Sequence, residues 1–216
     1  MKQYLLIGFF SISSFSISAA TLDTLKNYTK NSITFSPMKL IDNEIEFGIE
    51  HKFSRLISLK LEASLISNSN DYSYRNNNNN VTGTNMMIAF RKYIFYDQIY
   101  NRKQSQNLWG VYISPFLRYQ YITRKTTTED YDINGKLLST VTEKSFQNAL
   151  MAGLVTGMRF DLAKGLISFD FNIGFASKIS KVTGDPNYFY YGGAREHYYG
   201  KQGIIPAGNA TIGFNF

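Results

Sequence analysis

Large apolar residues recur at every second position in several stretches of the chain. In the segment 167–178, each odd-numbered residue from Ile167 to Phe175 is large and apolar, whereas the residues between them are polar or small. The segment 207–216 repeats the pattern, with Ile212 and Phe214 on one side. Because successive side chains of a strand point to opposite faces, such segments predict β-strands with one apolar face.

This period predicts eight strands in all. Most of them span ten residues or more, which is longer than a usual strand and sufficient to cross a bilayer at a tilt. Pro115 lies inside the fifth segment, and we expect a bulge there because proline removes a ladder donor. The predicted strands are 31–36, 44–53, 56–67, 83–96, 108–123, 148–162, 167–178 and 207–216.

The connections between these segments alternate in length. The short or medium ones are 54–55, 97–107 and 162–165, and the long ones are 68–82, 124–146 and 180–202. Short turns on one side and long loops on the other are typical of outer-membrane barrels. A soluble β-sandwich also alternates, but the combined pattern favours an all-β fold, an eight-stranded antiparallel up-and-down transmembrane β-barrel.

The segment 1–20 has the pattern of a secretory signal peptide. Lys2 is followed by a short apolar run and a Ser-rich stretch that ends Ser18-Ala19-Ala20, so small residues precede a cleavage after Ala20. The serines make a membrane-spanning helix the weaker alternative. We therefore expect a cleaved signal peptide at 1–20, a barrel domain at 21–216 and a location in the cell outer membrane. The chain has no cysteine, which suits export.

Charged residues stand in the middle of the strands, on the face opposite the apolar one. Eight strands leave an interior that side chains can fill, and a buried charge is tolerated only when it is paired. We expect these residues to form an ion-paired network that plugs the lumen; a proton or ion path, or a latch that opens a channel, is the alternative. The residues are Glu46, Glu50, Lys60, Glu62, Arg91, Arg118, Arg159 and Asp170.

Three stretches carry a resemblance to a known superfamily. They read EIEFGIEHKF at 44–53, GVYISPFLRY at 110–119 and IGFNF at 212–216. They resemble the small outer-membrane barrels that include the OmpA transmembrane domain and OmpX, and more closely the barrel proteins common in Bacteroidota. The resemblance covers about residues 31–216 and implies a fold, not a reaction. It also implies that Phe214 and Phe216 form the signal read by the barrel-insertion machinery, although Thr211 stands where that signal usually has glycine.

No arrangement of residues predicts an enzyme. Some barrel enzymes use a histidine with a serine two residues later, but His51 is followed by Phe53 and His197 by Tyr199. A lipid-modifying enzyme is therefore the least favoured hypothesis. No cofactor or metal site is expected, and a calcium site in the long 124–146 connection, at the acidic positions 130 and 132, is only a weak alternative.

The charge of the chain does not indicate nucleic acid as a partner. The net charge of +7 becomes +6 once Lys2 is removed, and cations and anions are equal in number within 124–146. No basic loop patch of the kind that follows phosphates is present. Four cations sit where the strands would leave the outer surface, and anionic lipid headgroups are their expected partner: Arg124, Lys125, Lys178 and Lys181.

The long loops hold two biased segments. The run of asparagines at 76–80 is of low complexity, and we expect it to be disordered. An aromatic cluster in the last long loop would bind an unknown surface ligand or, the favoured alternative, pack on itself or join an interfacial belt. It comprises Tyr188, Phe189, Tyr190, Tyr191, Tyr198 and Tyr199. The first function hypothesis is thus structural or surface interaction, and the second is a narrow channel for small solutes.

Overall fold

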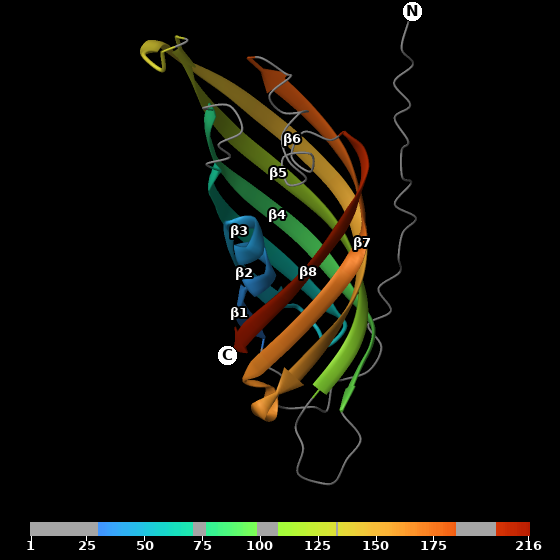
Figure 1. The fold of residues 1–216 in the computed structure, drawn as a ribbon. Coiled ribbons are helices and arrows are strands. Elements are labelled where there is room, and N and C mark those ends of the chain that lie inside the picture. The colour runs from blue at the N-terminus through green and yellow to red at the C-terminus, as the bar shows by residue number, and fades with distance from the viewer. Residues whose placement is uncertain (1–29, 71–76, 99–107, 133, 185–201) are drawn as a thin grey trace, which may run out of the picture.

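The fold is an eight-stranded antiparallel β-barrel in a computed structural model that describes residues 30–70, 77–98, 108–132, 134–184 and 202–216. Each strand pairs with its neighbours in sequence, and β1 pairs with β8, so the sheet closes on itself (Figure 1). The predicted up-and-down fold is confirmed. The strands are β1 (Asn31–Phe35), β2 (Glu44–Lys52), β3 (Ile57–Asn70), β4 (Asn77–Gln98), β5 (Leu108–Tyr131), β6 (Leu137–Leu162), β7 (Ile167–Thr183) and β8 (Gly203–Asn215).

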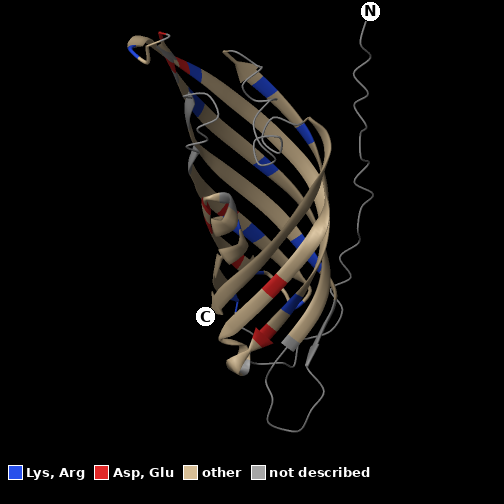
Figure 2. Cartoon of the chain, viewed as in Figure 1, with Lys and Arg blue, Asp and Glu red and all other residues tan. Residues whose placement is uncertain are grey.

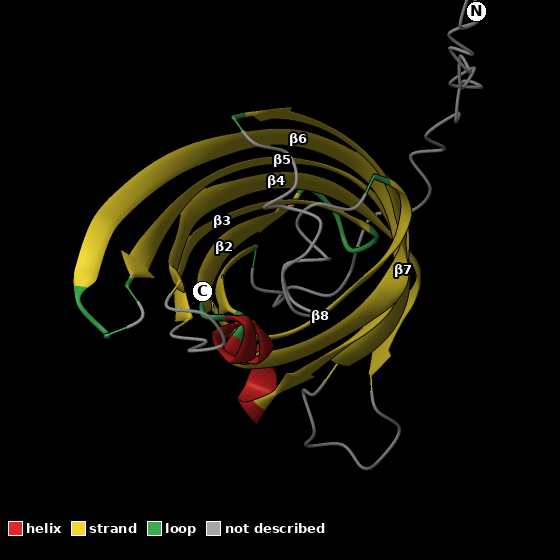
Figure 3. Cartoon of the chain, turned by 45° about the horizontal axis from the view of Figure 1, so that its top comes forward, coloured by secondary structure: helices red, strands yellow, loops and turns green. Residues whose placement is uncertain are grey.

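Two short 3-10 helices interrupt the strands: η1 (Pro37–Asp42) between β1 and β2, and η2 (Ala163–Gly165) between β6 and β7. Within the described ranges, neither helix is long and apolar enough to cross a membrane. Viewed along the barrel, the strands surround a central space, and both helices lie at the wall on the side where the C-terminus ends (Figure 3). We call the end that holds Phe216 the C-terminal end, and the opposite one the hairpin end, after the β5–β6 connection.

The strands on one side of the barrel are much longer than the sequence pattern indicated. β4, β5 and β6 span 22, 24 and 26 residues. The predicted long connection 124–146 is therefore wrong for most of its length, because Arg124 pairs with Ser145 and the pairing continues to Tyr131 and Leu137. The disorder predicted for 76–80 is also wrong where the structure describes it, since 77–80 begin β4. These extensions are mostly polar and their few apolar residues, such as Leu137, Leu138 and Val141, do not alternate regularly, so they lack the pattern that reveals a half-buried strand.

Pro115 does not produce the bulge that the sequence predicted. Ala89 pairs with Phe116 and Lys92 with Ile113 in one constant register, so the ladder passes Pro115 without a shift. The register shift lies instead between Tyr93 and Phe95 of β4. Pro115 lacks the backbone N–H that other residues donate to the ladder. Because its side chain is exposed on the outer face, it does not disturb the packing inside the barrel.

The two faces of the barrel wall have opposite character. Large apolar side chains such as Ile173 and Phe175 point outward, and Ile173 is 71% exposed. On β5, every outward residue from Val111 to Tyr121 is apolar or aromatic. Polar and charged side chains point inward and are buried, among them Arg159, Lys60 and Gln120. This is the reverse of a water-soluble protein, in which polar groups face the solvent.

The wall is not a uniform ladder, because β1 has only five residues. Its pairs with β8 run from Ser32–Asn215 to Phe35–Ile212. Beyond this point the chain turns into η1, which begins with Pro37 and ends at Asn43 in the left-handed conformation, with φ of 55°. Proline at the first position and a left-handed asparagine after the last turn both fit a short helix. At this level, η1 replaces a strand in the wall.

Candidate functional site

The structure places all eight of the predicted lumen residues inside the barrel. Seven of them are buried and Arg118 is half-buried. Acidic and basic positions follow one another along the lower half of the strands (Figure 2). Their contacts fall into two groups, which we call the end network, near the C-terminal end, and the middle network, nearer the centre.

Glu50 lies at the heart of the end network. Its carboxylate accepts hydrogen bonds from Arg159 Nη1 at 2.5 Å, from Arg91 Nη1 at 3.1 Å and from the Ser58 hydroxyl at 2.5 Å. Arg91 also pairs with Asp170. These four charges come from β2, β4, β6 and β7, so the network ties opposite sides of the wall together.

Asp161 and Lys52 complete the end network. Asp161 accepts a hydrogen bond from Arg159 Nε at 2.8 Å and pairs with Lys52 Nζ at 3.4 Å. Arg159 Nη2 donates to Asn215 Oδ1 at 2.7 Å, which attaches the last strand. The end network therefore holds three cations, Lys52, Arg91 and Arg159, and three carboxylates, Glu50, Asp161 and Asp170, and a balanced set lowers the cost of burying each ion.

An aromatic pair packs against these charges. The Tyr112 hydroxyl donates to Asp170 at 2.5 Å, and the Arg91 guanidinium lies 4.5 Å from the centre of the Tyr112 ring. Tyr93 meets Tyr112 edge to face, with ring centres 5.4 Å apart. Gly157 makes room for this arrangement, because a Cβ atom there would overlap the end of the Tyr112 ring.

The middle network holds as many charges as the end network, but the contacts of its arginine are longer. Glu62 pairs with Lys60 at 2.5 Å, whereas Arg118 lies 3.5 Å from Glu46 and 3.9 Å from Glu62. Glu44 pairs with Lys39 of η1 at 3.3 Å. With Lys39, Lys60 and Arg118 facing Glu44, Glu46 and Glu62, this network also holds three cations and three carboxylates.

Sequence reasoning omitted four charged members of the two networks: Lys39, Glu44, Lys52 and Asp161. Three of them carried a signal that could have found them. Glu44 and Lys52 share the inward phase of Glu46 and Glu50 on β2, and Asp161 shares that of Arg159 on β6. Lys39 gave no such signal, because it lies on η1 and its position depends on how that helix fits into the wall.

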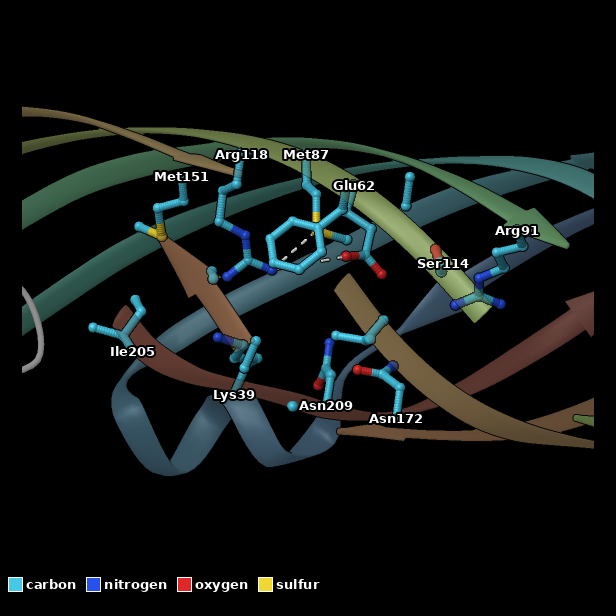
Figure 4. Close-up of a pocket in the computed structure, with 16 residues that line it drawn as sticks. Lys39, Glu62, Met87, Arg91, Ser114, Arg118, Met151, Asn172, Ile205 and Asn209 are labelled. Atoms are coloured by element: carbon cyan, nitrogen blue, oxygen red, sulfur yellow. Dashed lines mark hydrogen bonds and ion pairs between the residues drawn. The ribbon is translucent and has the colours of Figure 1, made fainter. Parts of the chain in front are cut away.

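A small cavity separates the two networks (Figure 4). Its volume is about 40 Å³, enough for on the order of one to three water molecules. Ser114 and Glu62 line it, and each has a buried oxygen, Ser114 Oγ and Glu62 Oε2, without a hydrogen-bond partner. Phe116, Met151 and Ile205 form the apolar part of the space.

The four cations expected at lipid headgroups divide into two pairs. Lys125 and Lys181 are exposed, as that prediction requires, but Arg124 and Lys178 are buried inside the barrel. Lys178 Nζ donates to Gln120 Oε1 at 3.0 Å. The headgroup interpretation is therefore wrong for Arg124 and Lys178, because their strand positions have the inward phase.

The remaining predicted residues lie at the rims or outside the described ranges. Phe214 and Phe216 are exposed on the outer face at the C-terminal end. His51 Nδ1 lies 2.8 Å from Asn31 Oδ1 at the same end. No group of three or more residues able to hold a metal ion occurs in the described part of the chain. His197, the segment 1–20 predicted as a signal peptide, and the aromatic residues Tyr188, Phe189, Tyr190, Tyr191, Tyr198 and Tyr199 lie outside it.

Comparisons with known proteins give two similar structures. The first is the crystal structure of Acinetobacter baumannii CarO2, which is 10% identical, with a TM-score of 0.40, and covers 87% of this chain and 98% of that one. The second is Acinetobacter baumannii CarO, 9% identical, with a TM-score of 0.39, covering 88% and 98%. No protein-family model and no curated protein sequence matches the chain.

Proposed function

We propose that this chain is an outer-membrane barrel whose wall is embedded in the lipid bilayer. The observation that carries the proposal is the outer face, where the strands expose large apolar residues. On β5 the apolar outward positions run from Val111 to Tyr121, and 11 residues match the roughly 9–11 residues of a tilted membrane-spanning strand. Closure of the sheet by the β1–β8 pairing supports the same proposal, because an open strand edge in lipid would leave backbone groups unpaired, and η1 packs against β8 beyond that pairing.

Within that membrane, we infer a structural role with a closed lumen and without catalysis. Support comes from the ion pairs of the end network, which join β2, β4, β6 and β7, and from the cavity beside them, whose volume is about 40 Å³. Ions that cross would have to displace paired charges that are already buried. The β5–β6 hairpin would present a surface to lipids or to a ligand outside the cell.

The test of this proposal is heat modifiability combined with conductance. The outer-membrane fraction is run on SDS gels with and without boiling, because a folded closed barrel resists SDS and shifts its mobility when boiled. The purified barrel is then placed in planar bilayers. We expect a shifted band and no stable conductance; recovery in the soluble periplasm with one unshifted band would contradict the membrane location.

A narrow channel is the second candidate, and one observation favours it. Arg118 is a half-buried cation of the middle network, with contacts of 3.5 and 3.9 Å, and it borders the cavity. The substitution Arg118→Ala would enlarge the space at this point. Conductance that appears in this variant, but not in the matched outward variant Leu117→Ala, would support a gated channel over a permanent plug.

The same proposal extends to the path by which the chain reaches the membrane. We infer export by a cleaved signal peptide at 1–20 and insertion by the barrel-insertion machinery, with Phe214 and Phe216 as its signal. The exposed position of Phe214 and Phe216 at the rim supports this role. We also propose that the chain is related to OmpA-type and Bacteroidota barrels, on the basis of the sequence stretches at 44–53, 110–119 and 212–216. Deletion of Phe216 should lower the amount of inserted barrel.

A further inference from the structure

The barrel wall has a break in its strand ladder beside β8. From Gly203 to Thr211, β8 pairs only with β7 among the described residues, because β1 ends at Phe35 opposite Ile212. On the other side of the break, β2 begins at Glu44. Helix η1 occupies the space between them and packs against both β2 and β8.

This break lies at the depth of the apolar belt. Ile205 of β8 pairs with Ala176 of β7, and Phe175 and Ile179 on either side of Ala176 are exposed on the outer face. Helix η1 likewise exposes apolar side chains, Met38, Leu40 and Ile41. The break would therefore face acyl chains instead of headgroups or water.

The cavity inside the barrel reaches the same break. Its lining includes Ala207, Gly208 and Asn209 of β8 and Lys39 of η1 (Figure 4). Ala207 and Gly208 are small, so the wall is thin at this point. Behind them, the buried side chains of Met151 and Ile205 pack with Phe116 as an apolar strip within the lumen.

Side-chain hydrogen bonds hold the break closed where ladder bonds are missing. Asn209 Nδ2 donates to Ser36 Oγ at 3.1 Å and to Glu46 Oε1 at 2.6 Å. Its own oxygen, Asn209 Oδ1, accepts from the backbone N–H of Ala210 at 2.9 Å. A single side chain thus joins β8 to β2 and η1, and such a contact gives way more easily than a continuous ladder.

We propose that this break is a lateral portal, through which the acyl chain of a free fatty acid passes from the bilayer into the barrel. The proposal rests on the membrane location proposed above. The chain would lie along the apolar strip of Phe116, Met151 and Ile205, after η1 moves outward and widens the cavity. A free fatty acid matches this lining, because its acyl chain would contact the apolar strip and its carboxylate would meet Lys39 and Arg118, two of the cations that line the same cavity.

The test uses two neighbouring residues that point to opposite sides of the wall. The folded barrel is reconstituted in vesicles that contain palmitate with a photoactivatable diazirine near the end of its chain, and labelled residues are mapped by mass spectrometry. Leu117 faces outward and Phe116 inward. We expect both to be labelled, with unlabelled palmitate competing only for Phe116, and a diazirine phospholipid labelling only Leu117.

A blocking variant tests the route. Ala207→Trp fills the thin part of the wall, and we expect it to reduce labelling of Phe116 about tenfold, which corresponds to about 1.4 kcal/mol. Ala152→Trp, on the exposed outer face of β6, is the matched control and should leave labelling unchanged. If Ala207→Trp loses its heat-modifiable band, Ala207→Leu provides the smaller block.

The outcomes distinguish a failure of the portal proposal from a failure of the proposed membrane location. Labelling of Leu117 without Phe116 overturns the portal and leaves the membrane barrel intact, whereas absence of label at both residues contradicts the membrane barrel itself. Equal labelling of Phe116 in the blocked and unblocked proteins shows another route and overturns the portal. Labelling of Phe116 by the phospholipid overturns the assignment to a single-chain lipid.

Discussion

The end network and the middle network hold the same charges in different ways. Each has three cations and three carboxylates, but the Arg159 side chain of the end network is only 1% exposed, whereas Arg118 of the middle network is 13% exposed. Arg159 lies 2.5 Å from its partner Glu50, and Arg118 lies 3.5 Å or more from Glu46 and Glu62.

The wall around each network explains the difference. The end network lies where β1 pairs with both neighbours and the ladder is complete. At Glu44 and Glu46, β1 has ended and η1 takes its place. Arg159 contacts its partners beside the complete ladder, whereas Arg118 borders the cavity and its contacts are longer. The short Lys60–Glu62 pair of the middle network lies opposite Glu50 and Gly48, where β1 still pairs with β2. The contrast between the networks is therefore a contrast between the surroundings of Arg159 and Arg118, and it does not extend to every ion pair in them.

The largest effect is expected from Arg159→Met in the end network. This change leaves Glu50 and Asp161 buried with fewer partners, and loss of one member of a buried pair costs about 3–5 kcal/mol. Equilibrium urea unfolding of the barrel in lipid vesicles measures the loss. The exposed cation Lys181 is the control, since Lys181→Met should change stability by less than about 0.5 kcal/mol. A loss below about 1 kcal/mol for Arg159→Met would contradict the importance given to the end network.

Gly157→Val tests the packing beside the end network. The added side chain meets the Tyr112 ring, and overpacking of this kind costs about 1–3 kcal/mol. The hydrogen bond from Tyr112 to Asp170 should weaken at the same time. The same unfolding experiment measures this loss, with Ala152→Val on the outer face as control. Equal stability of the two variants would show that Tyr112 moves aside without cost.

Arg118→Met should cost less than Arg159→Met and so tests the contrast directly. Glu62 keeps Lys60, and Glu46 keeps the hydrogen bonds from Ser36 and Asn209. We therefore expect a loss of about 1 kcal/mol, close to that of a partly exposed pair. Arg118→Lys should recover part of it. If the losses for Arg118→Met and Arg159→Met are equal, the two networks do not differ in the way described.

The smallest effect is expected at Lys39, at the edge of the middle network. Glu44 also accepts hydrogen bonds from Ser64 and Asn85 at 2.5 and 2.6 Å, so Lys39→Ala leaves it with partners. We expect a loss of less than about 1 kcal/mol that shrinks further in high salt, because the pair is only partly shielded from solvent. Unfolding at two salt concentrations checks this, and a salt-independent loss above about 2 kcal/mol would contradict it.

The sequence was sufficient to predict the strands wherever their two faces meet different surroundings. The segment predicted at 44–53 agrees with β2 to within one residue, because Glu, Ile and Phe alternate across a wall with unlike sides. The same rule fails at 124–131, where Thr126, Thr127 and Thr128 lie in a projecting ribbon. Neither face of such a ribbon is apolar, so periodicity carries no information there.

The sequence also predicted that the charged residues point into the barrel, but it did not predict which of them belong to the end network and which to the middle network. Glu46 and Glu50 lie on one strand and look equivalent in the sequence, yet they belong to different networks. Which network a residue joins depends on the register between strands and on η1. The helix itself was not predicted, since six residues between two short strands read equally well as a loop.

The unequal strand lengths have a consequence for what the outside of a cell would encounter. β5 continues for ten residues from Tyr121 to Tyr131, and at about 3.3 Å per residue and a tilt of about 40° this gives roughly 25 Å of height. A headgroup layer is only about 5–8 Å deep. The hairpin end around Gly135 would thus lie beyond the lipid headgroups, accessible to an antibody or a phage. A peptide epitope inserted beside Gly135 should therefore be exposed at the cell surface without disturbing the barrel.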